Sequence, residues 1–476
     1  MSMTPRERVL AAMKQESLDR PPVAIFTQSA TIGQMEKVGA AWPEAHKDAN
    51  LMAKLGAAQA DVFGFECVRA PFCLTAEAER LGCTVQVTKK DASPMLKEHP
   101  HKFDPMTGEY DEPNLMDPAE FVAGGRPAEA IKAMEILKKS HGENYCLVAG
   151  NTGPFTLTGH LVNTENMVFG MMMAPEEVSK WVDAVSPICK AYTQALSDAG
   201  ADVIQMSEPS ASTDMIAPDM FQDAAGKYIS DVLASVKDAF SVLHICGDTA
   251  PIIPKMIGTG VTGLSIEEKV NPDKAVDIVA GKAVLVGNVG SVRPLFQGTP
   301  EEVAAAAKHC VEAGFNVISS GCGIGSPRPT PTWKPSSRPS KAEGRQTRGD
   351  IQKPFKTKSF PFSAYLYTAR VLFPALYDIQ TGIQRPVRRG TQEDTGTEAR
   401  ARGRQACTRG GGLPGGLRGP RRTAQPLPGG VAGFQGRMPE GTVRIPQLPR
   451  RVGGPGDGTG TGEDNLGRVP RIHRDT

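Results

Sequence analysis

Apolar positions follow two alternating patterns along the chain as far as about residue 325. Short continuous runs rich in Val, Ile and Leu are typical of buried strands. Eight such runs occur, at 22–26, 61–65, 145–149, 202–206, 241–245, 263–267, 283–287 and 316–320. Amphipathic segments of helical period separate most of them, as at 175–200 and 299–314, and each of these two ends in Gly.

Strands that alternate with helices, and that read as continuous apolar runs, indicate a parallel sheet covered on both faces. Eight such units predict an α/β fold of the (β/α)8 (TIM) barrel type. The competing interpretation is a doubly wound open sheet, which the number of strands disfavours.

Composition changes abruptly after Gly325. The first 325 residues hold 27 basic and 41 acidic residues, a net charge of −14, whereas residues 326–476 hold 27 basic and 11 acidic residues, a net charge of +16. The second part is rich in Arg, Gly and Pro and has almost no periodic apolar face outside residues 363–379. Such a segment buries too little apolar area to offset its ordering entropy. We therefore expect a barrel domain at 1–325 and a disordered tail at 326–476.

Cysteine usage and the start of the chain bear on compartment and partners. Nine cysteines over 476 residues, with no secretory leader before the helix-like run TPRERVLAAMKQES, favour a reducing cytoplasm, and no apolar stretch is long enough to span a membrane. The basic tail suggests polyanion or RNA binding as an alternative function. Its Arg-Gly pairs occur only sporadically, so nucleic-acid binding is disfavoured.

Residues that favour a metal stand where two predicted strands end. His244 and Cys246 lie in SVLHICGD, Cys322 lies in NVISSGCG, and both apolar runs stop at Gly. In a (β/α)8 barrel the carboxyl ends of the strands form the active-site face, so these side chains are expected to converge. Two thiolates and one imidazole suit zinc and leave room for another donor and for substrate, which favours a thiol-alkylating enzyme. The competing interpretation is that the cysteines are small apolar core residues.

Four polar residues follow other predicted strands. Glu267 is either a metal ligand or a solvated residue of an EEK run. Glu208 is a candidate substrate-binding residue or a helix cap. Asn151 and Asn288 are candidate substrate-binding residues as well, although Asn151 stands in NTGPF, where an ordinary turn is the favoured interpretation.

Several segments resemble a known family. The runs MTPRERVLAAMKQESLDRPPV, NTGPFTLTGHL, ADVIQMSEPSAS, HICGD, SIEEKV and ISSGCGI are similar to those of the methylcobamide:coenzyme M methyltransferases of methylotrophic methanogens. These enzymes belong to the uroporphyrinogen decarboxylase superfamily, and the resemblance extends from residue 3 to about residue 325. It implies a (β/α)8 barrel of the uroporphyrinogen decarboxylase type.

The resemblance also implies residue roles. His244, Cys246 and Cys322 would hold Zn²⁺ and carry catalysis, and Glu267 would be a fourth, exchangeable ligand, with Glu268 as its competitor. The thiol of coenzyme M would attack the methyl group of a methylcobamide carried by a partner corrinoid protein, giving methyl-coenzyme M for methanogenesis. The alternative is a tetrapyrrole decarboxylase of the same superfamily, which needs no metal and leaves the three candidate ligands unexplained.

The sequence departs from the family after Gly325. Relatives continue with a helix that completes the eighth β/α unit, whereas this chain has prolines at 327, 329, 331, 335 and 339, which the interior of an α-helix does not tolerate. We expect the tail to replace that last helix. Translation in a shifted reading frame is one hypothesis for this change, and resequencing the locus tests it.

Overall fold

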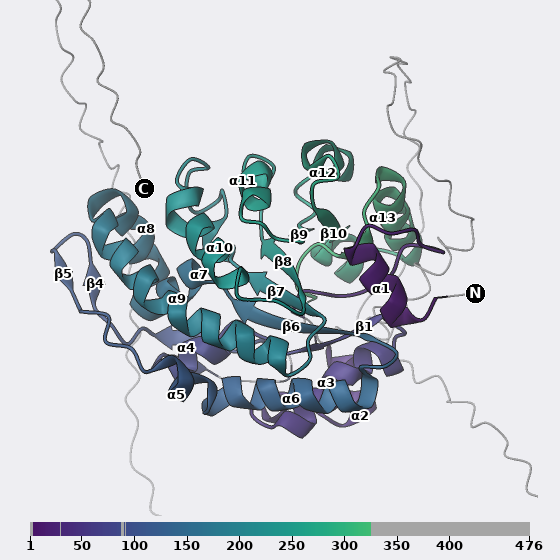
Figure 1. Ribbon diagram of the computed structural model, residues 1–476, viewed down its shortest axis with the longest axis horizontal. Coiled ribbons are helices and arrows are strands. Elements are labelled where there is room, and N and C mark those ends of the chain that lie inside the picture. The colour runs from purple at the N-terminus through teal and green to yellow at the C-terminus, as the bar shows by residue number, and fades with distance from the viewer. Residues whose placement is uncertain (1–2, 29, 87–89, 91, 325–476) are drawn as a thin grey trace, which may run out of the picture. The chain divides into compact units, whose positions relative to one another are not determined.

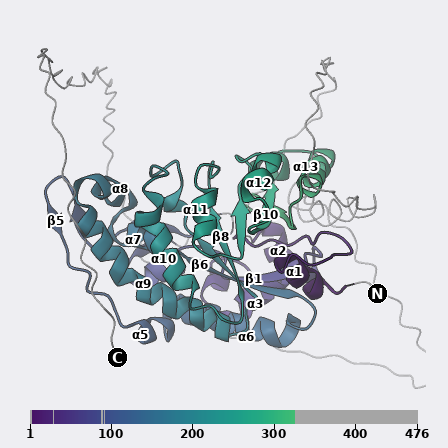
Figure 2. The same ribbon diagram turned by 45° about the horizontal axis from the view of Figure 1, so that its top comes forward.

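A computed structural model describes residues 3–28, 30–86, 90 and 92–324. Within them, seven parallel strands form one curled sheet in the order β1-β6-β7-β8-β9-β10-β11. Their bounds are β1 Cys67–Ala70, β6 Cys146–Thr152, β7 Val203–Ser207, β8 Phe240–Ile245, β9 Gly263–Ile266, β10 Val284–Val289 and β11 Val317–Ser320. Helices lie around the outside of this sheet (Figures 1 and 2).

Backbone hydrogen bonds from residues 22–24 close the sheet between β11 and β1. Val23 forms a parallel bridge with Ile318, and the Ala24 amide donates to the Ile318 carbonyl at 3.1 Å. On the other side, the Glu66 amide donates to the Val23 carbonyl at 2.9 Å. The predicted (β/α)8 barrel is therefore confirmed, with this segment in the eighth strand position. The strand predicted at 22–26 was too long, because only Val23 forms a bridge.

The second strand was predicted in the wrong place. Residues 61–65 follow or overlap the end of α3 (Ala49–Asp61), and the strand is β1, at Cys67–Ala70. Phe63 and Phe65 are buried in the connection, so they gave an apolar run without a strand. The observed strand contains Arg69 and follows Glu66, and these two charges break the apolar pattern that marked the other strands.

The helices have the local sequence signals expected of them. Their bounds are α1 Pro5–Met13, α2 Ile32–Val38, α3 Ala49–Asp61, α4 Ala76–Arg80, α5 Pro118–Val122, α6 Gly125–His141, α7 Pro154–Val162, α8 Thr164–Met173, α9 Pro175–Asp198, α10 Lys227–Leu233, α11 Ile253–Gly258, α12 Pro272–Val279 and α13 Pro300–Ala313. The predicted helices α9 and α13 are confirmed. At α13, Thr299 and Glu302 form a capping box, and Gly314 ends the helix in a left-handed conformation with a φ of 115°.

Several short elements complete the described part of the chain. Two antiparallel hairpins lie between β1 and β6 in sequence, and short 3-10 and π segments adjoin the longer helices and strands. These elements are β2 Thr84–Gln86 with β3 Met95–Glu98, β4 Phe103–Asp104 with β5 Glu109–Tyr110, η1 Glu44–His46, η2 Pro209–Ala211, η3 Gln222–Gly226 and η4 Ser291–Phe296.

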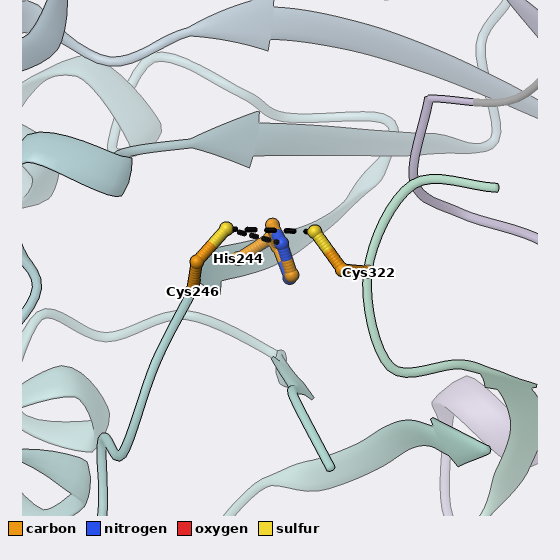
Figure 3. A group of neighbouring side chains, drawn as sticks. All are labelled: His244, Cys246 and Cys322. Atoms are coloured by element: carbon orange, nitrogen blue, oxygen red, sulfur yellow. Dashed lines mark hydrogen bonds between the residues drawn. The ribbon is translucent and has the colours of Figure 1, made fainter. Parts of the chain in front are cut away.

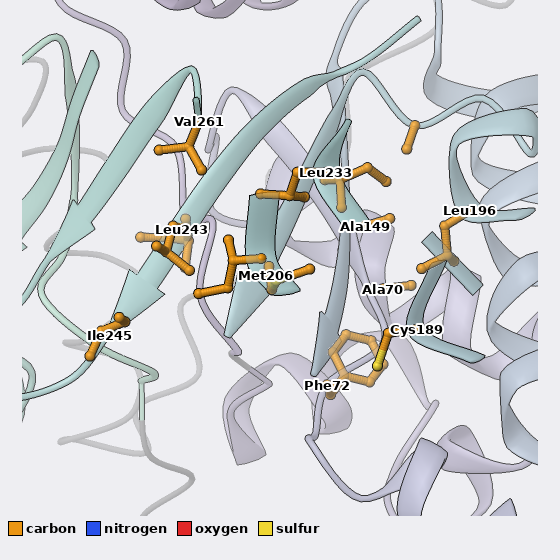
Figure 4. Close-up of a cluster of buried hydrophobic side chains, with 14 of the residues drawn as sticks. Ala70, Phe72, Ala149, Cys189, Leu196, Met206, Leu233, Leu243, Ile245 and Val261 are labelled. Atoms are coloured by element: carbon orange, nitrogen blue, oxygen red, sulfur yellow. The ribbon is translucent and has the colours of Figure 1, made fainter. Parts of the chain in front are cut away.

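Apolar side chains on the outer face of the sheet form the main core with the helices. Figure 4 shows part of this cluster, which includes Ala149, Met206 and Leu243 from the strands and Leu196 and Leu233 from the helices. A second, smaller cluster fills the amino-terminal end of the barrel. Its members include Val9, Ala12 and Met13 of α1 with Ala24, Phe26, Val148, Val203, Val242, Val286 and Val317.

The interior becomes polar toward the carboxyl ends of the strands. Side chains two residues apart on a strand share a face. The inward positions after Cys67, Val203, Val242, Gly263 and Val317 are therefore Arg69, Gln205, His244, Ser265 and Ser319. An apolar floor thus supports a polar end of the barrel, which is where the active site of this fold lies.

None of the helices in the described ranges combines the length and the apolar character that crossing a membrane requires. The predicted tail at 326–476, and with it the domain boundary and the polyanion-binding alternative, lies outside the described residues.

Candidate metal centre

Three side chains from the ends of β8 and β11 come together at the carboxyl end of the barrel (Figure 3). Nε2 of His244 lies 3.4 Å from Sγ of Cys246, and Sγ of Cys246 lies 3.5 Å from Sγ of Cys322. Across the described residues, this is the one group of at least three His, Cys, Asp or Glu side chains close enough to share a metal ion. We call His244, Cys246 and Cys322 the metal triad.

The geometry of the metal triad fits a tetrahedral zinc ion. Zinc bonds of about 2.3 Å to sulfur and about 2.0 Å to nitrogen place two donor atoms about 3.5–3.8 Å apart in a tetrahedron. The observed separations of 3.4 and 3.5 Å lie close to that range. The two cysteines are free thiols rather than a disulfide. Zinc prefers such a set of two sulfurs and one imidazole nitrogen, and three protein ligands leave a position for substrate.

A neighbouring strand fixes the ring of His244. Its Nδ1 lies 3.2 Å from the carbonyl oxygen and 3.0 Å from Oγ of Ser265, on β9. His244 is only 2% exposed, so this contact is made away from solvent. A hydrogen bond at Nδ1 leaves the other nitrogen, Nε2, to face the two cysteines, as is usual for histidines that bind metals.

Hydroxyl groups from other loops fix the backbones of both cysteines. Oγ of Ser212, after β7, donates to the Cys246 carbonyl at 2.8 Å. Oγ of Ser291, after β10, accepts from the Cys322 amide and donates to the Cys322 carbonyl, both at 3.1 Å, and Oγ1 of Thr27 donates to that carbonyl at 3.0 Å. Several β/α units of the barrel therefore hold the triad.

The two thiols are coupled electrostatically. Their hydrogen bond lowers the pKa of Cys322 to about 4 and raises the pKa of Cys246. The physical cause is that two close sulfurs share one proton, so one of them is a thiolate near neutral pH. Thiolate is the form that binds a metal.

Two carboxylates lie beside the triad without belonging to it. Oε2 of Glu267 accepts from the Gly247 amide at 2.5 Å, next to Cys246. Oε1 of Glu268 accepts from the Ser291 amide at 3.1 Å, and a Cβ at Gly321, next to Cys322, would lie 2.3 Å from Oε2 of Glu268. The β9 side of the site is therefore acidic, and the role of Glu267 as a fourth ligand stays a prediction.

Glu208 makes a contact within the fold. It is fully buried and caps α7, because its carboxylate accepts from the amides of Phe155 at 3.2 Å and Thr156 at 2.5 Å. Burial raises the pKa of Glu208 to about 7. The helix that it caps is the one after β6 rather than the next helix along the chain.

Asn151 and Asn288 also contact other elements of the fold. Nδ2 of Asn151 donates to Oγ1 of Thr193 on α9 at 2.7 Å. Nδ2 of Asn288 donates to the carbonyls of Val270 at 2.7 Å and Glu267 at 3.2 Å, so it positions the loop that carries Glu267. The substrate-binding roles predicted for Glu208, Asn151 and Asn288 stay predictions.

The sequence interpretation missed several polar residues close to the triad. Ser265 orients His244, and Arg69, Gln205, Ser207 and Gln28 form a hydrogen-bonded network inside the barrel. Arg69 had a visible signal, since a charged residue between buried strand positions needs an explanation. The serines and glutamines had none.

The fold and the site together define a (β/α)8 barrel in which three side chains that could hold a soft divalent metal meet at the carboxyl end of the strands. The chain belongs to the uroporphyrinogen decarboxylase (URO-D) family, which it matches over residues 4–331.

Relatives within this match are methyltransferases. The chain is 36% identical to the methylcobamide:CoM methyltransferase MtbA of Methanosarcina acetivorans over 335 residues, which are 69% of this chain and 94% of the relative. It is 33% identical to the methylcobamide:CoM methyltransferase MtaA of Methanosarcina barkeri over 326 residues, 67% of this chain and 93% of the relative. A solved methyltransferase from Methanosarcina mazei superposes with a TM-score of 0.63 at 34% identity, over 68% of this chain and 94% of that one.

Proposed function

We propose that this protein transfers a methyl group from a methylated cobamide, carried by a corrinoid protein, to the thiol of coenzyme M. The product would be methyl-coenzyme M, the methyl carrier of methanogenesis, formed in the cytoplasm. The names of the relatives at 33–36% identity support the donor and the acceptor. The observation that carries the proposal for this chain is the convergence of His244, Cys246 and Cys322.

Zinc held by the metal triad would supply a Lewis acid that lets a thiol ionise at neutral pH. The residues of the chain have distinct tasks around it. His244, fixed through Nδ1 by Ser265, presents Nε2 as a neutral donor. Cys246 and Cys322 add negative charge, which keeps a neighbouring substrate sulfur electron-rich and nucleophilic. Glu267, beside Cys246, is the proposed fourth ligand that yields to substrate.

The surface around the site supports a macromolecular methyl donor. Met215 lies in the loop after β7, and Val292 and Phe296 lie in η4 after β10, and they are 39%, 58% and 41% exposed. Both loops are anchored to the triad, since Ser212 holds the Cys246 carbonyl and Ser291 holds Cys322. Exposed apolar side chains beside a catalytic mouth are typical of a surface that a protein partner covers.

The family is named after a tetrapyrrole decarboxylase, so decarboxylation of a tetrapyrrole is the second candidate activity. The metal triad disfavours it, because a reaction that needs no metal gives no reason for three buried or half-buried soft ligands to meet within 4.8 Å of one another. The relatives that match at 33–36% identity are methyltransferases.

Zinc content and methyl transfer test the proposal together. The purified full chain is expected to bind about one zinc and to methylate coenzyme M from methylcob(III)alamin, with formation of cob(I)alamin followed by absorbance. His244→Ala and Cys322→Ala should lose both properties, whereas Cys146→Ala, which removes a thiol from the amino-terminal end of the barrel, should keep both. A zinc-free wild-type chain that releases CO₂ from uroporphyrinogen would instead establish the decarboxylase.

A further inference from the structure

The sheet order gives the metal triad two different sides. On one side of the barrel, β9 and β10 lie between β8 and β11, and the charged side chains next to the triad on this side are Glu267 and Glu268. On the other side of the barrel lie β7, β6, β1 and residues 22–24. The inward polar side chains on this side are Ser207, Gln205 and Arg69, together with Gln28, which follows residues 22–24. We call these last four residues the donor side.

Hydrogen bonds connect the donor side across the barrel interior. Nη2 of Arg69 donates to Oε1 of Gln205 at 3.0 Å, and Nε2 of Gln205 donates to Oγ of Ser207 at 2.8 Å. Nε2 of Gln28 donates to the same Ser207 Oγ at 3.0 Å. The glutamine orientations follow from this pattern, since the Gln205 oxygen must face the guanidinium.

Arg69 is a buried cation without a bound carboxylate among the described residues. Its Nε donates to the Phe26 carbonyl at 2.7 Å, its Nη1 donates to the Pro71 carbonyl, and its Nη2 donates to Gln205. All three acceptors are neutral, and Arg69 is 1% exposed. Burial lowers its pKa to about 10, so it stays charged at neutral pH, and Glu77 acts on it only at a distance.

The donor side contains N–H and O–H groups to which no acceptor is assigned among the described residues. A guanidinium has five N–H groups, and the structure assigns acceptors to three of those of Arg69. Ser207 accepts two hydrogen bonds at Oγ, and its own hydroxyl hydrogen has no acceptor among the described residues. Buried donors and an unpaired buried cation both favour an anion as their partner.

This network also lies next to the metal ligands. Ser207 pairs in register with His244 across β7 and β8, and both side chains face inward. On the other strand, the Gln28 carbonyl accepts from the Ile324 amide at 3.1 Å, two residues after Cys322. The donor side therefore extends from the His244 side of the triad to the Cys322 side.

We propose that the donor side binds the anionic end of the thiol substrate and thereby sets its specificity, an inference that rests on the proposed function. Coenzyme M carries a sulfonate two methylene groups from its thiol. With the thiol at the metal triad, Ser207 and Arg69 donate their free hydrogens to the sulfonate oxygens, and Gln28 and Gln205 hold Ser207 in place. Glu267 and Glu268 repel the sulfonate from the opposite side.

Two thiols of equal chain length test this subsite. Coenzyme M and 2-mercaptoethanol differ in having a sulfonate or a hydroxyl at the same position, and their binding to the zinc-loaded full chain is measured by calorimetry. The wild type should prefer coenzyme M. Arg69→Met should reduce coenzyme M affinity at least tenfold and change 2-mercaptoethanol affinity less than threefold, with zinc content unchanged. Arg69→Lys, which keeps a charge, should lie between the two.

A second pair of variants avoids any loss of folding at Arg69. Ser207→Ala should reduce the preference for coenzyme M several-fold. Ser319→Ala, which removes another buried serine hydroxyl from the barrel interior, should not change it. An unchanged preference in Ser207→Ala and Arg69→Lys, or an equal loss of both thiols in the Arg69 variants, overturns the subsite while methyl transfer by the wild type still supports the function. A zinc-loaded wild type that binds neither thiol overturns both.

Discussion

Ser265 holds the imidazole of His244 from the adjacent strand. Nδ1 of His244 lies 3.2 Å from the Ser265 carbonyl oxygen, which can only accept, and 3.0 Å from its Oγ. The proton of a neutral ring is therefore on Nδ1, and the lone pair of Nε2 faces Cys246 and Cys322. One residue on β9 thus sets both the tautomer and the direction of a candidate metal ligand on β8.

Removal of the Ser265 hydroxyl should weaken metal binding without abolishing it. In Ser265→Ala the carbonyl contact remains, so His244 keeps its tautomer but loses one of two contacts at Nδ1. We expect zinc affinity to fall about tenfold, at the low end of the range for residues that orient metal ligands. Competition with a fluorescent zinc chelator measures this change.

Ser319→Ala is the matched control for Ser265→Ala. Ser319 is also a fully buried serine on a barrel strand, but its Oγ has no hydrogen-bond partner among the described residues. The zinc affinity of Ser319→Ala should equal that of the wild type. Equal losses in the two variants would mean that general loosening of the barrel, rather than the contact with His244, explains the effect.

The fourth metal ligand can be assigned by X-ray absorption. If Glu267 completes the site in the absence of thiol, zinc should have two sulfur and two nitrogen or oxygen neighbours. Glu267→Ala should lose the carboxylate oxygen or replace it with water, and zinc affinity should fall, because the anionic ligand is gone. Addition of coenzyme M should give a third sulfur in both proteins.

Glu268→Ala is the corresponding control at the next position. Glu268 lies on the same acidic side but accepts from the Ser291 amide rather than from the residue after Cys246. The atoms bound to zinc in Glu268→Ala should match those in the wild type. A changed metal shell in Glu268→Ala, with a wild-type shell in Glu267→Ala, would exchange the roles of the two glutamates.

The sequence contained enough to predict that the metal triad converges, because strand ends are local features. His244 lies near the end of one apolar run, and Cys246 and Cys322 follow runs that stop at Gly, and barrel topology brings such ends together. The barrel itself was predictable from the same alternation of strands and helices. Its eighth position was less clear, since residues 22–24 contribute only a bridge and a few backbone bonds.

Side-chain partners that are distant in sequence could not be predicted in this way. Gln205 donates to Ser207 on its own strand, but Arg69 lies 136 residues before Gln205, and Gln28 lies 179 residues before Ser207. No local pattern specifies such pairs, because each depends on strand order and on register in the closed barrel. Glu208 illustrates the same limit, since the helix that it caps precedes it in the chain.

The exposed apolar side chains beside the mouth should affect a protein-bound donor but not a free one. Val292→Ser with Phe296→Ser removes most of the apolar surface of η4, which is 58% and 41% exposed at these positions. We expect KM for a methylated corrinoid protein to rise about tenfold, as for loss of one interface hot spot. The rate with free methylcob(III)alamin should stay within twofold of the wild type.

Met95→Ser is the control for this surface. Met95 lies on β3, in a hairpin between β1 and β6, and is 66% exposed. The substitution should leave KM for the corrinoid protein unchanged. If both donors lose rate equally in the η4 variant, the segment acts through Ser291 and Cys322 rather than as a docking surface.

Burial of Glu77 makes the stability of the fold depend on pH. Its carboxyl is fully buried, and burial raises its pKa from 4.5 to about 7, although Oε1 accepts from the Thr152 amide at 2.8 Å. Between these two values the folded state holds a proton that the unfolded state has released, so stability falls as pH rises through this window. Glu77→Gln removes the titration and keeps an acceptor for Thr152.

The free energy of unfolding of the wild type should therefore fall between pH 5 and pH 8 by about 2 kcal/mol more than that of Glu77→Gln. Urea unfolding at several pH values measures the difference, and other titrating groups cancel because both proteins share them. Glu143→Gln, at an exposed position, should follow the wild-type curve. Parallel curves for the wild type and Glu77→Gln would show that Glu77 has the same pKa in the folded and unfolded states.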